Sequence, residues 1–173
     1  MRTINMSLVV LLALPTLGQA EYTRVELKIL GMDCATCAHG VRVAVQKVDG
    51  VESVELSLER ASADIRLRPA NRVSIDRFRQ IVKANGFEPK QASVTAVGTV
   101  RETGGTLTFD VSGVATALAI SPDKSTPEAY KQLKTAADLK SAIPFEIVGT
   151  VQPRTSRTGD GMDTVVVTSA RAR

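Results

Sequence analysis

The sequence predicts an α+β protein with two small domains, a βαββαβ unit followed by a mostly β domain with one helix. The first half alternates between strand-like and helix-like apolar patterns in that order, and the second half has short strand-like stretches separated by glycines. The 173 residues, 43% hydrophobic and 23% charged, are enough for two small cores. We assign residues 1–20 to a leader, 21–96 to the first domain and 97–173 to the second.

The leader is typical of a signal peptide. Arg2 supplies a positive charge, the stretch from Met6 to Leu17 is apolar, and Gly18-Gln19-Ala20 supplies the small residues found before a cleavage site. This apolar stretch is shorter than the roughly 20 residues of a spanning helix, and no other stretch approaches that length. We therefore expect a periplasmic or secreted protein, cleaved near Ala20, with no membrane span in the mature chain.

The first domain begins with a strand and a helix. Arg24 to Leu30 alternate polar and apolar residues, which predicts a half-buried strand. After Cys37, apolar residues follow the i, i+3, i+4, i+7 spacing of a helix face at Val41, Ala44, Val45 and Val48. Gly50 favours a helix end at Asp49-Gly50. The connecting loop holds Gly31-Met32-Asp33-Cys34-Ala35-Thr36-Cys37.

The rest of the first domain repeats these patterns. Residues 53–59 and 63–68 alternate and predict a hairpin, and residues 89–96 predict a fourth strand. Ser74 is a candidate N-cap for a helix that ends at Asn85-Gly86. Its predicted inward face is Ile75, Phe78, Ile81 and Val82. This order is that of the ferredoxin-like fold, with both helices on one face of an antiparallel sheet. It places the cysteine loop near Gly86 and Phe87.

The second domain is predicted to have three strands, a helix and two strands. The strands are expected at residues 98–101, 106–111, 117–121, 145–152 and 164–169. Thr126-Pro127-Glu128 is typical of a helix start, and Tyr130 and Phe145 are expected to fill the core. This order is that of a five-stranded OB-like β-barrel.

Two similar stretches in the sequence support a barrel. Ala96-Val97-Gly98-Thr99-Val100 resembles Ile147-Val148-Gly149-Thr150-Val151. A glycine inside a strand commonly marks a bulge or a bend. We interpret the two stretches as similar strand starts and not as a duplication.

Cys34 and Cys37 are the only cysteines of the chain, in a CxxC spacing at a predicted helix start. Two cysteines in an exported protein are ordinarily read as one disulfide. A bridge over so short a loop adds little stability, which favours a functional role for the pair. The unpaired N–H groups and the dipole at a helix start favour the thiolate, which binds soft metals and attacks disulfides.

The loop, the βαββαβ order and Gly86-Phe87 together resemble the heavy-metal-associated (HMA) domain. This family includes copper chaperones, the periplasmic mercury-binding protein and domains of metal-exporting P-type ATPases. The resemblance covers about residues 22–96. It implies that Cys34 and Cys37 bind one soft ion and that Met32 packs in the core beneath the loop. Phe87 would lie near the loop, where it either shields the site or is plain core.

The chemistry of the pair narrows the choice of metal. Two thiolates suit Cu(I) or Hg(II), whereas a structural zinc site needs four ligands and no second cysteine pair exists. Asp33 departs from the commoner family pattern, which has Thr there, and resembles domains of zinc, cadmium and lead exporters. Its carboxylate is a candidate third ligand for Zn(II) or Cd(II), or simply faces water or caps the loop.

Several functions are disfavoured. His39, two residues after Cys37, would turn away from the thiols and is expected on the surface. The chain has a net charge of +4 spread along its length, 3% aromatic residues and no Trp, which disfavours nucleic-acid binding. No Ser has a suitable His partner and no paired carboxylates stand out, so we expect no enzyme.

The leading hypothesis is an exported, non-enzymatic heavy-metal-binding protein that transfers or sequesters an ion held by Cys34 and Cys37. Its acceptor would be a membrane metal transporter or another protein. A thiol-disulfide redox protein using the same CxxC is the first alternative. The second is a protein-binding module in which the barrel is the working part.

Overall fold

The computed structural model describes residues 21–111, 114, 117–122, 124–153 and 162–173, so the predicted leader lies outside the described residues. The elements of the first half follow the predicted order, with ends shifted by a few residues. They are β1 (Glu21–Leu30), α1 (Ala35–Gln46), β2 (Val51–Ser57), β3 (Ser62–Leu67), α2 (Ile75–Ala84) and β4 (Glu88–Thr103).

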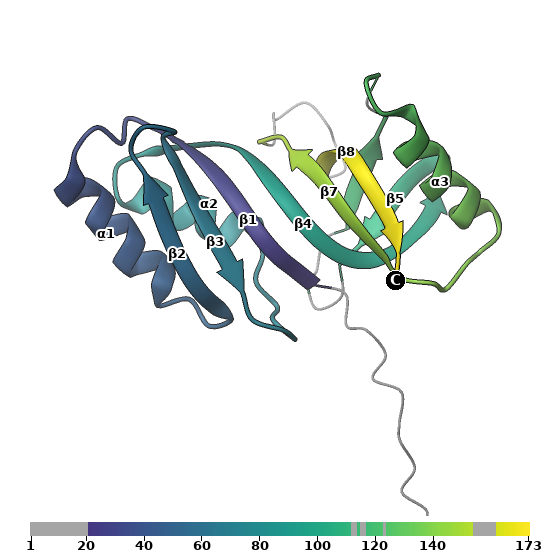
Figure 1. The fold of residues 1–173 in the computed structure, drawn as a ribbon, viewed down its shortest axis with the longest axis horizontal. Coiled ribbons are helices and arrows are strands. Elements are labelled where there is room, and N and C mark those ends of the chain that lie inside the picture. Colours follow the sequence, from purple (N-terminus) through teal and green to yellow (C-terminus); the bar gives the residue numbers. More distant parts are fainter. Residues whose placement is uncertain (1–20, 112–113, 115–116, 123, 154–161) are drawn as a thin grey trace, which may run out of the picture.

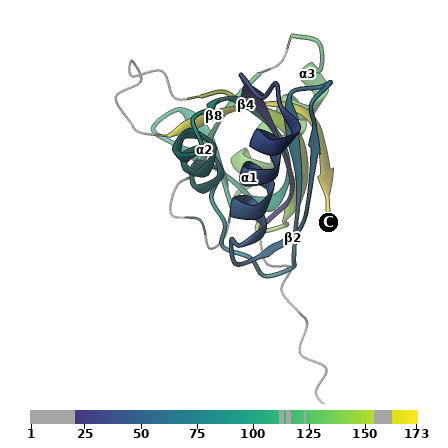
Figure 2. The same cartoon turned by 90° about the vertical axis from the view of Figure 1, so that its left-hand side faces the viewer.

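The strands of the first half form an antiparallel sheet in the order β2-β3-β1-β4. Both helices cover the same face, α1 against β2 and α2 against β4 (Figures 1 and 2). Buried and more exposed residues alternate along β1, where Val25, Leu27 and Ile29 are fully buried. One face of the sheet is therefore apolar, and the helices cover that face. The ferredoxin-like fold predicted for this half is confirmed.

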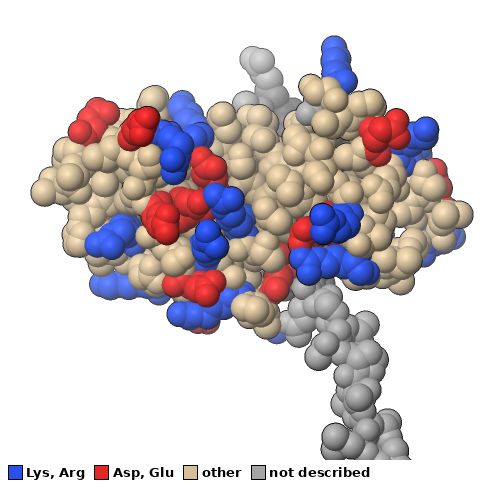
Figure 3. Space-filling view, in the orientation of Figure 1, with Lys and Arg blue, Asp and Glu red and all other residues tan. Residues whose placement is uncertain are grey.

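The opposite face of this sheet is charged. Arg24 of β1 donates two hydrogen bonds to Asp64 of β3, one of them 2.8 Å long, and Lys28 lies 3.1 Å from Glu26. The hydrogen bond from Arg24 holds the pKa of Asp64 below its usual value. Figure 3 shows positive and negative side chains interspersed over this face. The face therefore offers no single-sign surface for a polyanion.

Strand β4 joins the two halves. The sequence predicted two strands, at 89–96 and 98–101, but Glu88–Thr103 form one strand of 16 residues. Its first part pairs with β1 and its last part with β5 (Thr106–Asp110) (Figure 1). The domain boundary placed at 96/97 falls inside this strand, because Gly98, which we expected at the start of a new strand, lies in the interior of β4.

The strand pairings of the second half close a ring. Beyond β5 the elements are β6 (Leu118–Ser121), α3 (Pro127–Asp138), β7 (Phe145–Val151) and β8 (Asp163–Ala172). Each strand pairs with the next in the order β4-β5-β6-β8-β7, and β7 pairs back onto β4. Only β6 and β8 among these pairs are parallel in the described residues. The predicted order of three strands, a helix and two strands is present, and most of the loop at 153–162 lies outside the described residues.

Gly98 and Gly149 permit close packing within the ring. A Cβ on Gly98 would lie 2.3 Å from the Asp110 carbonyl oxygen and 2.7 Å from the Phe109 ring. A Cβ on Gly149 would lie 2.7 Å from the Val166 carbonyl oxygen. The register shifts between Val148 and Gly149, as expected of a bulge, whereas the pairing of Gly98 with Phe145 continues the ladder. Both glycines therefore allow a close approach between strands, and only Gly149 also lies at a bulge.

Helix α3 packs against β4 and β8. Thr126 is its N-cap residue, as predicted, but the Thr126 hydroxyl donates to the Val167 carbonyl and does not cap the helix. Phe145 is buried and Tyr130 is partly buried against the core. None of the helices in the described residues is long and apolar enough to cross a membrane.

A buried ion pair connects the two halves. Arg79 of α2 donates to Asp163 at the start of β8 at 2.8 Å and to the Gln152 carbonyl at 3.1 Å. Arg79 also lies 3.1 Å from Asp76, on its own helix. Arg79 and Asp163 are only 8% and 5% exposed, so both charges are withdrawn from water. Burial, and then the nearby Asp163 carboxylate, raise the pKa of Tyr22 well above its usual value.

Candidate metal centre

The loop between β1 and α1 carries the two cysteines. Gly31 turns the chain after β1 with a φ of +86°, a conformation that favours glycine. Helix α1 begins at Ala35, two residues earlier than predicted, with Cys34 as its N-cap residue. Cys37 therefore lies in the first turn of the helix. The loop places both cysteines at the positive end of the α1 dipole.

Cys34 and Cys37 are joined by a disulfide, with their Cα atoms 5.4 Å apart. Cys34 is partly buried, and Cys37 is exposed. Cysteine binds a metal ion as the thiolate, so the disulfide must first be reduced to the dithiol. Once reduced, the two sulfurs lie close enough to converge on one small ion.

The surroundings of Cys34 favour a negative charge on its sulfur. The Cys34 Sγ atom accepts a hydrogen bond of 3.1 Å from the Cys37 backbone N–H. The first turn of α1 has no acidic residue to oppose a thiolate. A hydrogen bond and the positive end of the helix dipole both stabilise the charged form.

Thr36 adds a contact that the sequence reasoning missed. Its Oγ1 atom lies 3.3 Å from Cys34 Sγ, within hydrogen-bond reach of the sulfur. A hydroxyl in this position is able to donate to a thiolate. The available signal was the presence of a hydroxyl residue between the two cysteines, on the same turn.

Met32 and Phe87 lie beneath and beside the loop. Met32 is 2% exposed and packs in the core of the first half. The Phe87 ring is partly buried against the same core, and it lies 3.9 Å from where a Cβ on Gly31 would be. Met32 is therefore buried in the core of the first half, and Phe87 lies close to the loop at Gly31.

Replacing Met32 with Ala is expected to lower the free energy of unfolding by about 2–5 kcal/mol, because it leaves a cavity in a packed core. Urea denaturation followed by circular dichroism measures this change. Leu30→Ala is the matched control, since Leu30 is 56% exposed two residues away, and we expect a change within about 0.5 kcal/mol. Equal losses in the two variants would show that Met32 does not support the loop from the core.

Asp33 and His39 do not join the cysteines in a three-ligand group. Asp33 is exposed, and the N-cap residue of α1 is Cys34. His39 is exposed on α1, with Nδ1 3.3 Å from Arg42 Nη2. Within the part of the chain that the structure describes, no three Cys, His, Asp or Glu side chains gather in a metal-binding arrangement. The site as described is thus a two-sulfur site.

The model of the heavy-metal-associated domain family matches residues 26–88. The copper chaperone CopZ of Staphylococcus haemolyticus (strain JCSC1435) is 28% identical over 64 residues, which cover 37% of this chain and 93% of the chaperone. A copper binding domain from the P-type ATPase HMA7 is 26% identical, with a TM-score of 0.36, covering 42% of this chain and 92% of that chain. The yeast copper transporter domain CCC2A is 22% identical, with a TM-score of 0.36, covering 42% and 93%.

The family match coincides with the first half of the fold. It begins in β1, contains the cysteine loop and both helices that cover the sheet, and ends at the first residue of β4. The family model therefore matches the part of the chain that carries Cys34 and Cys37.

Proposed function

We propose that this protein is an exported, non-enzymatic carrier that binds one soft metal ion through Cys34 and Cys37. The observation that carries the proposal is the position of both sulfurs at the N-terminus of α1, with Cys37 exposed and Cys34 hydrogen-bonded to the Cys37 N–H. After reduction, two thiolates at this helix end supply the charge and the softness that such an ion requires.

Cu(I) is the ion that we propose first. Thiolates select soft ions. A site with two of them and, among the described residues, no third ligand suits the low coordination number of Cu(I) or Hg(II) better than that of Zn(II) or Cd(II). The resemblance to a copper chaperone over most of that protein's length supports the same choice. The ion is cargo in this account and leaves with an acceptor.

The exposure of Cys37 favours transfer over storage. A ligand of an acceptor protein is able to reach an ion held at the molecular surface and to replace one thiolate at a time. We propose a membrane metal transporter or another protein as that acceptor. Export, with cleavage near Ala20, remains a proposal from the sequence. The closed strand order with its helix between the third and fourth strands supports the proposal of an OB-like barrel in the second half.

An anaerobic competition titration tests the metal assignment. The mature chain is reduced, freed of reductant and titrated with Cu(I), Hg(II), Zn(II) and Cd(II) against a chelator of known affinity. We expect uptake of one soft ion per chain in the reduced form and none in the disulfide form. Failure of the reduced chain to bind any of the four ions stoichiometrically would overturn the proposal.

The role of Asp33 is tested with an Asp33→Thr variant. Because Asp33 is exposed and belongs to no three-ligand group, we expect zinc affinity to change by less than about threefold. Zinc affinity is measured in the same competition assay, with Glu52→Thr as a control for the loss of an exposed acid. A tenfold or greater loss confined to Asp33→Thr would identify the carboxylate as a zinc ligand.

The disulfide itself favours a second candidate function, thiol-disulfide exchange. Cys37, one of the two bridged residues, is exposed, so a dithiol is able to attack the Cys34–Cys37 bond and form a mixed disulfide. The second thiol of the attacking dithiol then releases Cys34 and Cys37 as thiols, and the dithiol leaves as a disulfide. The Cys34–Cys37 pair gains two electrons in this exchange. Turnover in a disulfide-reduction assay, without metal uptake, would favour this function. Slow reduction without turnover would agree with a carrier whose site is opened by reduction.

A further inference from the structure

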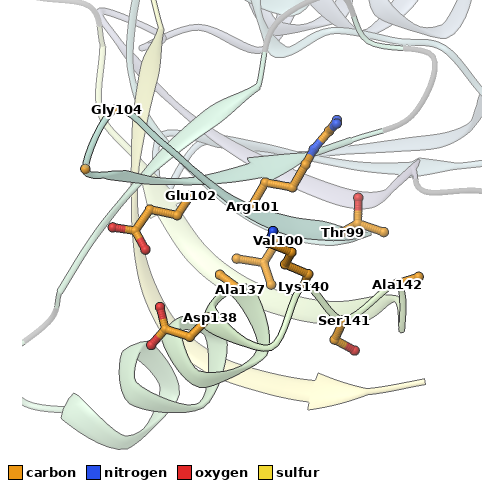
Figure 4. Close-up of a pocket in the computed structure, with 11 residues that line it drawn as sticks. Thr99, Val100, Arg101, Glu102, Gly104, Ala137, Asp138, Lys140, Ser141 and Ala142 are labelled. Carbon is orange, nitrogen blue, oxygen red and sulfur yellow. The ribbon is translucent and has the colours of Figure 1, made fainter.

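A cleft of about 930 Å³ lies in the second half, between the end of β4 and the segment that follows α3. Val100 and Ala137 are buried and give it an apolar floor, and its walls carry charged side chains from both segments (Figure 4). Its volume falls in the range of pockets that hold small molecules or short peptides. Nothing in the metal carrier function uses it.

The two ends of the cleft differ in charge. Glu102 of β4 and Asp138 of α3 lie at one end (Figure 4). Lys134 approaches their carboxylates at 3.5 and 3.3 Å. The hydrogen bond to Asp138 raises the pKa of Lys134. Two carboxylates that share one lysine leave this end net negative. An ammonium group of a ligand is therefore attracted to it.

Lys140 supplies a positive charge from the segment after α3, two residues beyond Asp138. In Figure 4 its side chain extends from the segment after α3 toward Val100. Arg101, the other cation of the lining, is paired with Asp110 at 2.5 Å. Among the described residues Lys140 has no ion-pair partner, so its ammonium is available to a carboxylate.

The backbone at Lys140 is one that favours glycine. Lys140 has a φ of +51°, its N–H donates to the Ala137 carbonyl, and the Ser141 N–H donates to the Ala136 carbonyl. This is a Schellman motif, whose left-handed position is usually glycine. A lysine there is unfavourable for the backbone, but it brings an ammonium group to the cleft. A residue that costs stability and supplies an unpaired charge is typical of a binding position.

We propose that this cleft binds a short peptide with free termini. The terminal carboxylate pairs with Lys140, the terminal ammonium lies at the Glu102 and Asp138 end, and small side chains pack on Val100 and Ala137. A ligand that is charged at one end alone pairs with one set of charged side chains in the cleft. The other charged side chains then lose water without gaining a partner. The proposal is independent of the metal carrier function.

The test uses trialanine as the probe, together with its N-acetyl and C-amide derivatives. Titration of the isotope-labelled mature chain, followed by NMR at the backbone amides of residues 99–105 and 137–142, locates and measures binding. We expect trialanine to bind there and each capped derivative to bind about tenfold more weakly or worse. Absence of shifts with millimolar trialanine, or equal binding of the capped peptides, would overturn the proposal.

Variants at Lys140 separate binding from folding. Lys140→Gly relieves the left-handed backbone, so we expect an equal or higher Tm together with at least about tenfold weaker trialanine binding. Lys140→Arg keeps the charge and should bind within about threefold of the parent. Ala70→Gly relieves another left-handed residue, with φ of +61°, outside the cleft and should leave binding unchanged. Undiminished binding in Lys140→Gly would contradict the assignment.

Discussion

A Cys34→Ser/Cys37→Ser variant is expected to take up no Cu(I) in an anaerobic competition titration in which the reduced parent takes up one ion. Serine hydroxyls remain protonated near neutral pH and offer hard oxygen, so both the charge and the softness of the site are lost. The expected loss exceeds the roughly 10–100-fold that follows removal of a group supporting a ligand.

The same variant should remain folded, which makes the result interpretable. Serine is a preferred N-cap residue, so position 34 still caps α1, and the bridge between Cys34 and Cys37 closes only a small loop. Met162→Leu, which removes a sulfur far along the chain, is the matched control and should bind like the parent. Stoichiometric uptake by the double serine variant would place the metal elsewhere.

An Arg79→Leu variant is expected to lose about 3–5 kcal/mol of unfolding free energy, because it removes the guanidinium that faces the buried Asp163 carboxylate. The loss would be measured by urea denaturation. Since Arg79 belongs to α2 and Asp163 to β8, the lost contact joins the first half of the fold to the ring.

Two further variants identify the source of the Arg79 effect. Arg24→Leu breaks an exposed Arg–Asp pair of the same residue types and should cost no more than about 1 kcal/mol. Arg79→Leu/Asp163→Leu removes both charges and should recover much of the loss, because an apolar pair of similar volume is often as stable. A small loss in Arg79→Leu, equal to that of Arg24→Leu, would show that the pair does not fasten the two halves.

The first half of the fold was predictable because its periodicities are strong and local. Alternation in Arg24 to Leu30 and helical spacing from Val41 to Val48 each report which face is buried. The continuity of β4 was not predictable in this way. Gly98 was interpreted as part of a strand start, and the close approach of Phe109 and Asp110 that requires a glycine there appears only in the folded structure.

The two cysteines of the candidate site stood out in the sequence, but the contacts around them did not. The CxxC spacing and the family resemblance identified Cys34 and Cys37 directly. The contact between Thr36 and Cys34 depends on the local turn, and the Arg79–Asp163 pair joins residues 84 positions apart. Neither contact produces a periodic pattern in the sequence, because each depends on how irregular or distant segments meet in three dimensions.

X-ray absorption spectroscopy of the Cu(I)-loaded, reduced mature chain identifies the ligands of the ion, since it reports the ion's nearest neighbours. We expect one copper per chain with two sulfur neighbours, and loss of that signal in the Cys34→Ser/Cys37→Ser variant. A spectrum dominated by nitrogen or oxygen neighbours, or one that persists in the double serine variant, would contradict a metal site at Cys34 and Cys37.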